Sequence, residues 1–98
     1  MGKVIRAPRA TIDIWEIADR IAADKVSAAV KLLGEFDKAL GRLADFPGMG
    51  PRRDDVKPGV RTFPVGNYIL YYPLVKGGIE LLRVIHGARH VDDDSFER

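Results

Sequence analysis

The sequence predicts an α+β domain in which an N-terminal strand and an antiparallel helical hairpin pack on a small antiparallel sheet. Two observations predict this fold class. Apolar residues recur at helical spacing through residues 8–45, whereas residues 60–86 form short segments rich in β-branched and aromatic side chains. The expected order of elements is therefore β-α-α-β-β-β. With 98 residues, the chain is expected to form a single domain over 1–98.

The first helix is expected to begin at Pro8, after a short strand over 3–6. Proline suits the first helical turn, because its missing N–H would have no partner there. The main apolar face of this helix has spacings of 4, 3 and 4 residues and consists of Ala10, Ile14, Ile17 and Ile21. Ile12 and Trp15 lie off that face, three residues apart, so they should neighbour each other on a second face.

A second helix is expected after a break over 24–27, with Ser27 as its N-cap. Its apolar residues have spacings of 4, 3, 4 and 3 residues and are Ala29, Leu33, Phe36, Leu40 and Leu43. Pro47 should end this helix. Two helices joined by so short a break predict an antiparallel hairpin.

Three strands are expected after an irregular loop over 46–59. They span 60–65, 68–72 and 79–86, with turns at 66–67 and 76–78. The last strand is apolar on both faces, which is typical of a strand that is covered on both sides. Because two helices can cover only one side of a small sheet, the other side would lie against the surroundings of the first strand, a loop or another polypeptide. The sequence leaves these three possibilities open.

Positive and negative charges separate in the second half of the chain, although the net charge is only +2. The segment 52–89 contains seven basic and three acidic residues, a net charge of +4. An acidic tail over 91–98 follows, with Asp92, Asp93, Asp94 and Glu97 against Arg98. We expect this tail to be solvated. The pattern suits an anionic target, an acidic partner, or a tail that partly neutralises the body of the protein.

Most enzyme classes are excluded because their residues are missing. The chain has no cysteine, which excludes disulfide scaffolds, thiolate zinc sites and thiol nucleophiles. His86 and His90 are four residues apart, but Gly87 follows the strand that ends at His86, so a helical metal site is not expected. Phosphate-binding glycine motifs and the G-x-S-x-G elbow are also absent. We therefore expect no metal and no cofactor.

The sequence also shows neither a signal peptide nor an apolar run of membrane-spanning length. A cytoplasmic protein without membrane contact is expected.

Basic and aromatic side chains gather in the sheet half of the chain. They are Arg61, Tyr68, Tyr71, Tyr72, Arg83, His86 and Arg89. Metal-free RNA cleavage needs such residue types, because one group removes the 2′-hydroxyl proton, cations stabilise the phosphate and another group protonates the leaving oxygen. Tyrosines can equally fill a sheet, and arginines can surround its edge, without any chemistry. The residue types alone leave both interpretations open.

Four segments are specific as a set, through their order and spacing. They are Ala10-x-x-Asp13-Ile14-x-Glu16-Ile17-x-x-x-Ile21, Leu43-x-x-Phe46-Pro47-x-Met49-Gly50, Gly59-Val60-Arg61-x-Phe63-Pro64-Val65-Gly66-x-Tyr68-x-x-x-Tyr72 and Ile79-Glu80-Leu81-Leu82-Arg83-Val84-Ile85-His86-Gly87-Ala88-Arg89. With residues around them, they cover 5–90 and resemble the ParE/RelE superfamily of toxins from bacterial toxin–antitoxin pairs. The ending from Arg83 to Arg89 is similar to ParE in particular.

The resemblance implies a cytosolic toxin that inhibits DNA gyrase, blocks replication and is held by a cognate ParD-like antitoxin. It implies no sequence-specific DNA contact by the toxin itself, because the antitoxin binds the operator. The residues expected to contact partners are Ile12, Trp15, Arg61, Tyr68, Arg83, His86 and Arg89. Arginines could pair there with antitoxin carboxylates while apolar neighbours become buried.

Two alternatives remain. RelE relatives cut mRNA on the ribosome with basic residues, and Arg61, Arg83, His86 and Arg89 would supply such a set. Pro64 stands where those nucleases often carry an arginine, and no tyrosine follows Arg89, which favours the non-nuclease branch. The second alternative is a relative that binds its antitoxin but is not toxic.

Overall fold

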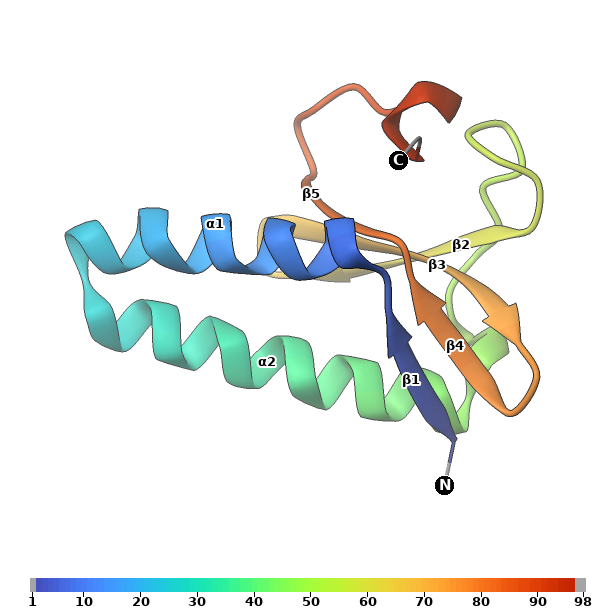
Figure 1. The fold of residues 1–98 in the computed structure, drawn as a ribbon, viewed down its shortest axis with the longest axis horizontal. Helices are drawn as coiled ribbons and strands as arrows, with labels where there is room; N and C mark the ends of the chain where they lie inside the picture. The colour runs from blue at the N-terminus through green and yellow to red at the C-terminus, as the bar shows by residue number, and fades with distance from the viewer. Residues whose placement is uncertain (1, 97–98) are drawn as a thin grey trace.

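The computed structural model describes residues 2–96, and these residues form a helical hairpin on one side of a mixed β-sheet (Figure 1). The elements are β1 (Lys3–Arg6), α1 (Pro8–Asp24), α2 (Val26–Asp45), η1 (Pro47–Met49), β2 (Val60–Val65), β3 (Tyr68–Val75), β4 (Gly78–Leu81), β5 (Arg83–His86) and η2 (Asp93–Phe96). The predicted α+β class and the predicted order of elements are confirmed.

The two helices are joined by a single residue, Lys25, whose extended backbone (φ −153°, ψ 109°) reverses the chain. The predicted N-cap at Ser27 is wrong, because α2 already begins at Val26 and its N-terminus has no side-chain cap. Both predicted apolar faces are buried or half-buried against the sheet. Packing of these faces, rather than capping, therefore stabilises the hairpin.

The sheet has the order β1-β4-β3-β2, and β5 pairs with β3 beyond the end of β4. The predicted last strand is thus divided at Leu82, whose N–H still donates to the carbonyl of Tyr71 at 2.8 Å. Strands β2 to β5 pair in antiparallel fashion, as predicted. β1, however, runs parallel to β4, with Lys3 opposite Gly78. Gly78 permits this approach, because a Cβ there would lie 1.9 Å from the carbonyl oxygen of Lys3.

The main core lies between the helical hairpin and the inner face of the sheet. Tyr72 is fully buried there, and its hydroxyl links the sheet to the loop that leaves α2. This hydroxyl accepts a hydrogen bond from the N–H of Gly50 at 3.0 Å and donates one to the carbonyl of Pro47 at 3.0 Å. The irregular loop is therefore held against the core by a buried polar contact.

A second, smaller apolar cluster lies on the sheet and is centred on Val60, Tyr71 and Ile85. Val91 and Phe96 of the C-terminal tail pack against it. The sequence left three possible covers for the second face of the sheet open. In the structure, a loop of the chain itself, the C-terminal tail, covers this face. The expectation of a wholly solvated tail is wrong for Val91 and Phe96, although Asp92, Asp93 and Asp94 are exposed. The rest of the predicted tail, residues 97–98, lies outside the described residues.

Candidate partner-binding site

An ion pair between Asp13 of α1 and Arg83 of β5 joins the helical hairpin to the sheet. Arg83 donates from Nε to Oδ2 of Asp13 at 2.7 Å and from Nη2 to Oδ1 at 3.0 Å. The same carboxylate accepts the N–H of Val84 at 3.0 Å and lies 3.3 Å from Nε of Arg9. Both partners are buried, with exposed fractions of 6% each. This bidentate geometry satisfies charges that would otherwise be costly to bury.

The third nitrogen of Arg83 reaches the C-terminal tail. Nη1 donates to the carbonyl oxygen of Ser95 at 2.6 Å. All three nitrogens of the guanidinium therefore donate to groups within the chain. The sequence suggested Arg83 as a direct contact for a partner, whereas the structure places it inside, where it positions α1, β5 and the tail relative to one another.

A cavity of about 560 Å³ opens between the start of α1, the junction of β4 and β5, and the tail. Its lining includes three of the residues that the sequence suggested for partner contact, namely Ile12, Arg83 and Arg89. Arg9, Leu82 and Phe96 also line it, and sequence reasoning missed all three. Phe96 carried a usable signal, because a lone aromatic residue in an acidic tail is unusual for a solvated segment.

Trp15 lies on a different cavity, a groove of about 410 Å³ between α1 and α2. The groove is lined by Arg6, Ile14, Trp15, Ala18, Asp19, Leu33, Phe36 and Asp37. An ion pair of 2.8 Å between Arg6 and Asp37 stands at its rim. Trp15 is 68% exposed and Ile12 is 46% exposed, so the second face of α1 presents apolar surface to solvent. Such a groove with an aromatic edge fits the apolar side of a helix.

Tyr68 and His86 are cross-strand partners at the far end of β3 and β5. The Tyr68 ring is buried and meets the His86 ring edge-on at 5.4 Å. His86 is exposed, and its Nδ1 accepts the N–H of Ala88 at 3.1 Å. Both rings line a polar cavity of about 200 Å³ together with Arg89. Arg89 thus lies between this cavity and the larger one beside the tail.

Arg61 does not join the other suggested residues. It lies on β2, where its Nη1 donates to the carbonyl of Gly50 at 2.7 Å and to that of Gly48 at 3.3 Å. These bonds hold the loop after α2 against the sheet. Arg61 therefore makes a structural contact on β2, which stands at the opposite end of the strand order from β1.

The basic loop between η1 and β2 neutralises much of its own charge. Arg53 donates to both carboxylate oxygens of Asp55, at 2.9 and 3.0 Å, and this lowers the pKa of Asp55 below its ordinary 3.8. The pKa of Asp54 is also lowered, first by the N–H of Gly59 and then by Arg52. The positive charge expected for this segment is thus partly paired within the loop itself.

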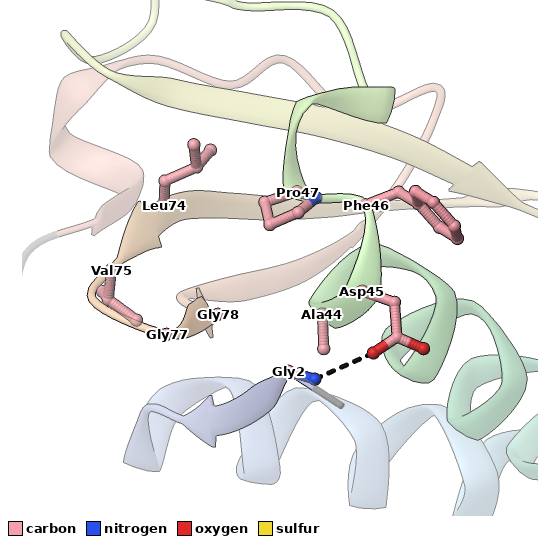
Figure 2. A pocket seen from close by; sticks show the side chains of 9 residues that line it. All are labelled: Gly2, Ala44, Asp45, Phe46, Pro47, Leu74, Val75, Gly77 and Gly78. Carbon is pink, nitrogen blue, oxygen red and sulfur yellow. Dashed lines mark hydrogen bonds between the residues drawn. The ribbon is translucent and has the colours of Figure 1, made fainter.

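The cavity in Figure 2 lies at the other end of the molecule, beside the start of β1, and has a volume of about 610 Å³. Asp45 is the titratable residue in its lining, and its carboxylate accepts the N–H of Gly2 at 2.8 Å (Figure 2). Exposed Phe46 and Leu74 give this end an apolar surface. The lining offers no pair of groups for acid–base chemistry.

Other functional chemistry has few residues available to it in residues 2–96. No group of three or more histidine, aspartate or glutamate side chains converges there as a metal site would require. Likewise, none of the helices in this part of the chain is long and apolar enough to cross a membrane.

A helical hairpin on a mixed sheet, with exposed apolar residues on α1 and an arginine-lined cavity beside the tail, defines a small α+β domain. Residues 4–91 match the family model described as "ParE toxin of type II toxin-antitoxin system, parDE", and the chain belongs to this family. The resemblance inferred from the four sequence segments is therefore confirmed.

Curated relatives support this assignment. The chain is 31% identical over 92 residues to Toxin ParE3 of Caulobacter vibrioides, covering 93% of this chain and 92% of that protein. It is 33% identical over 82 residues to Toxin ParE1 of Mycobacterium tuberculosis, covering 82% and 81% respectively. A solved structure titled "Chromosomal ParDE TA system from P. aeruginosa" has the same fold, with a TM-score of 0.74 at 20% identity, covering 88% of this chain and 96% of that one.

Proposed function

We propose that this chain is the toxin of a type II toxin–antitoxin pair that acts in the cytoplasm, inhibits DNA gyrase and is neutralised by a cognate ParD-like antitoxin. Membership of the ParE family over residues 4–91 is the observation that carries this proposal. The toxin would act by occupying another protein rather than by catalysis of its own.

The positions of the arginines support binding over catalysis. A ribosome-dependent nuclease would draw its cations from Arg61, Arg83 and Arg89, with His86 as a proton carrier. Arg61 donates to loop carbonyls, and Arg83 donates to Asp13 and Ser95, so both have internal partners. A phosphate in a cleavage transition state needs donors aimed at its oxygens. Two of the three candidate cations would have to leave their partners to supply them.

The exposed face of α1 is the surface we propose for the antitoxin. Trp15 edges the groove between the helices, and Ile12 lines the neighbouring cavity beside the tail. Exposed aromatic and apolar side chains of this kind are typical anchors of protein interfaces. Arg89 would add a charged contact in that cavity. Tyr68 and His86, which line a neighbouring cavity together with Arg89, would help to position the Arg89 side chain. Arg61 and Arg83 would contribute by shaping the surface.

The test is a gyrase supercoiling assay with the purified protein, with and without the proposed cognate antitoxin. A parallel assay with purified ribosomes separates the nuclease alternative. Transcript cutting that requires ribosomes and disappears in Arg89→Ala would contradict the proposal. Normal growth after induced expression without antitoxin would instead indicate a relative that is no longer toxic.

A further inference from the structure

The polar cavity of about 200 Å³ lies between α1 and the end of β5, two elements that run side by side (Figure 1). Its charged lining comes from one face of α1, at spacings of four, three and four residues, and from the turn after β5. These charged residues are Arg9, Asp13, Glu16, Arg20 and Arg89. Arginines from two separate elements therefore surround one small space.

The positive charge in this lining is only partly balanced within the chain. The buried Arg83 already neutralises the carboxylate of Asp13. Three arginines then remain against the single carboxylate of Glu16, which leaves a net charge of +2. Within residues 2–96, the guanidinium groups of Arg20 and Arg89 form no ion pair, and both side chains are exposed. Their donors are free to bind an anion that enters the cavity.

His86 adds a donor whose orientation is fixed by its neighbours. Its Nδ1 accepts the N–H of Ala88 at 3.1 Å, so the neutral ring carries its proton on Nε2, which can donate. The ring also packs edge-on against Tyr68. The N–H of Arg89 donates to the carbonyl of His86 at 3.0 Å and closes the turn that carries both side chains. This wall of the cavity is therefore ordered before any ligand arrives.

We propose that the polar cavity binds a terminal phosphate group, the chemistry shared by inorganic phosphate and phosphate monoesters. Guanidinium groups match the oxygens of phosphate in geometry and charge. A terminal phosphate carries nearly two negative charges at neutral pH, which matches the net charge of the lining. The cavity is smaller than the roughly 300–1,000 Å³ typical of sites for whole drug-sized ligands, so it would take the phosphate and leave the remainder of a monoester outside.

Glu16 is the group in the lining that opposes this ligand. It is exposed and lies one helical turn before Arg20, so its charge would repel a bound phosphate. A surface on which the charges merely balance one another would not respond to phosphate when this carboxylate is removed. Glu16 therefore separates a phosphate site from an ordinary charged surface.

The test is an NMR titration of the full-length, ¹⁵N-labelled protein at neutral pH and constant ionic strength. The probes are inorganic phosphate, adenosine 5′-monophosphate, and a hexathymidylate that lacks terminal phosphates. The first two should give saturable shifts of the side-chain Nε–H signals of Arg20 and Arg89, with similar affinities, because only the phosphate is bound. Chloride at the same ionic strength should give none of these shifts.

Three variants test the contribution of single charges. Arg20→Gln should weaken binding of inorganic phosphate at least about fivefold, the effect of losing one exposed ion pair. Arg42→Gln removes the same charge from an exposed position on α2 outside the cavity, and screening should keep its effect below about twofold. Glu16→Gln should bind phosphate more tightly than the unaltered protein. The amide spectrum of each variant shows whether it is folded.

Shifts that do not saturate, or that chloride reproduces, would overturn the proposal. So would equal losses in Arg20→Gln and Arg42→Gln, or unchanged or weaker binding in Glu16→Gln. Tighter binding of the hexathymidylate than of the monophosphate would overturn the assignment to a terminal phosphate and indicate a nucleic-acid backbone instead. The proposal does not rest on gyrase inhibition, because the titration uses the isolated protein.

Discussion

Arg83 joins three separate parts of the chain through one guanidinium group. It contacts Asp13, which is 70 residues away in sequence, and Ser95, which is 12 residues away. A basic residue on a predicted strand looks the same in the sequence whether it faces solvent or a buried carboxylate. The sequence could therefore identify Arg83 as notable, but only the fold could show that its nitrogens point inward.

Removal of the Asp13 carboxylate should be strongly destabilising. Asp13→Ala would leave the buried Arg83 without its main partner, and breaking one half of a buried pair costs about 3–5 kcal/mol of unfolding free energy. Urea denaturation measures this. Asp19→Ala on the same helix is a control, because Asp19 is exposed and its loss should change stability by less than about 0.5 kcal/mol. Equal stability of the two variants would contradict the structural assignment of the pair.

Two neighbouring tyrosines provide a comparison between a hydroxyl that is hydrogen-bonded inside the protein, at Tyr72, and one that is not, at Tyr71. Tyr72→Phe would leave the N–H of Gly50 without its partner, so we expect a loss of about 1–3 kcal/mol. Among the described residues no hydrogen bond to the Tyr71 hydroxyl is found, so Tyr71→Phe should be close to neutral. Thermal and urea unfolding of the two variants would show the difference. A larger loss for Tyr71→Phe would mean that the Tyr72 hydroxyl does not hold the loop.

The same tyrosines give stability an alkaline limit. Burial raises the pKa of both phenols above the ordinary 10.0. This rise is opposed only in part, by Arg53 at Tyr71 and by the N–H of Gly50 and then Arg61 at Tyr72. Because the folded pKa is raised, the neutral phenol is the form that folding favours. Their contribution is therefore complete below pH 10 and is lost as the pH rises through the folded pKa.

At the scale of elements, the helical hairpin was predictable from the sequence, whereas the packing of residues 91–96 on the sheet was not. The spacing of apolar residues predicted which face of α1 and of α2 is buried, since a period near 3.6 sustained over many residues is specific to an amphipathic helix. Residues 91–96 are too few to show such a period, and their three aspartates predicted a segment exposed to solvent. The parallel pairing of β1 also left no local signal, because it depends on the position of β4, more than 70 residues further along the chain.

The exposed face of α1 should matter for binding and not for folding. Trp15→Ala removes a side chain that is 68% exposed, so the free energy of unfolding should change by less than about 0.5 kcal/mol. If Trp15 anchors the antitoxin, its loss should weaken the complex by about 2 kcal/mol or more, roughly 30-fold. Isothermal titration calorimetry with the antitoxin measures this.

Val30→Ala is the control for this change, because Val30 is an exposed apolar residue on α2 outside the groove. It should leave the affinity nearly unchanged. Unaltered antitoxin affinity in Trp15→Ala would place the antitoxin on another surface.

At the scale of the whole molecule, the described residues present several separate surfaces. Different elements build three surfaces: the groove between the helices, the cavity beside the C-terminal tail and the apolar end at Phe46. Much of the positive charge near the sheet is paired internally, at Arg53 with Asp55 and at Arg83 with Asp13. Composition alone suggested a basic surface, and the structure shows that part of this charge is paired within the chain.

Inhibition of gyrase by the purified protein is the measurement that tests the proposed function most directly. Increasing amounts of toxin are added to gyrase and relaxed plasmid, and supercoiled product and cleaved DNA are followed together. We expect supercoiling to fall, cleaved DNA to accumulate, and stoichiometric antitoxin to reverse both effects. Full supercoiling at a large excess of folded toxin, with no cleaved DNA, would contradict the proposal that this ParE-family protein acts on gyrase.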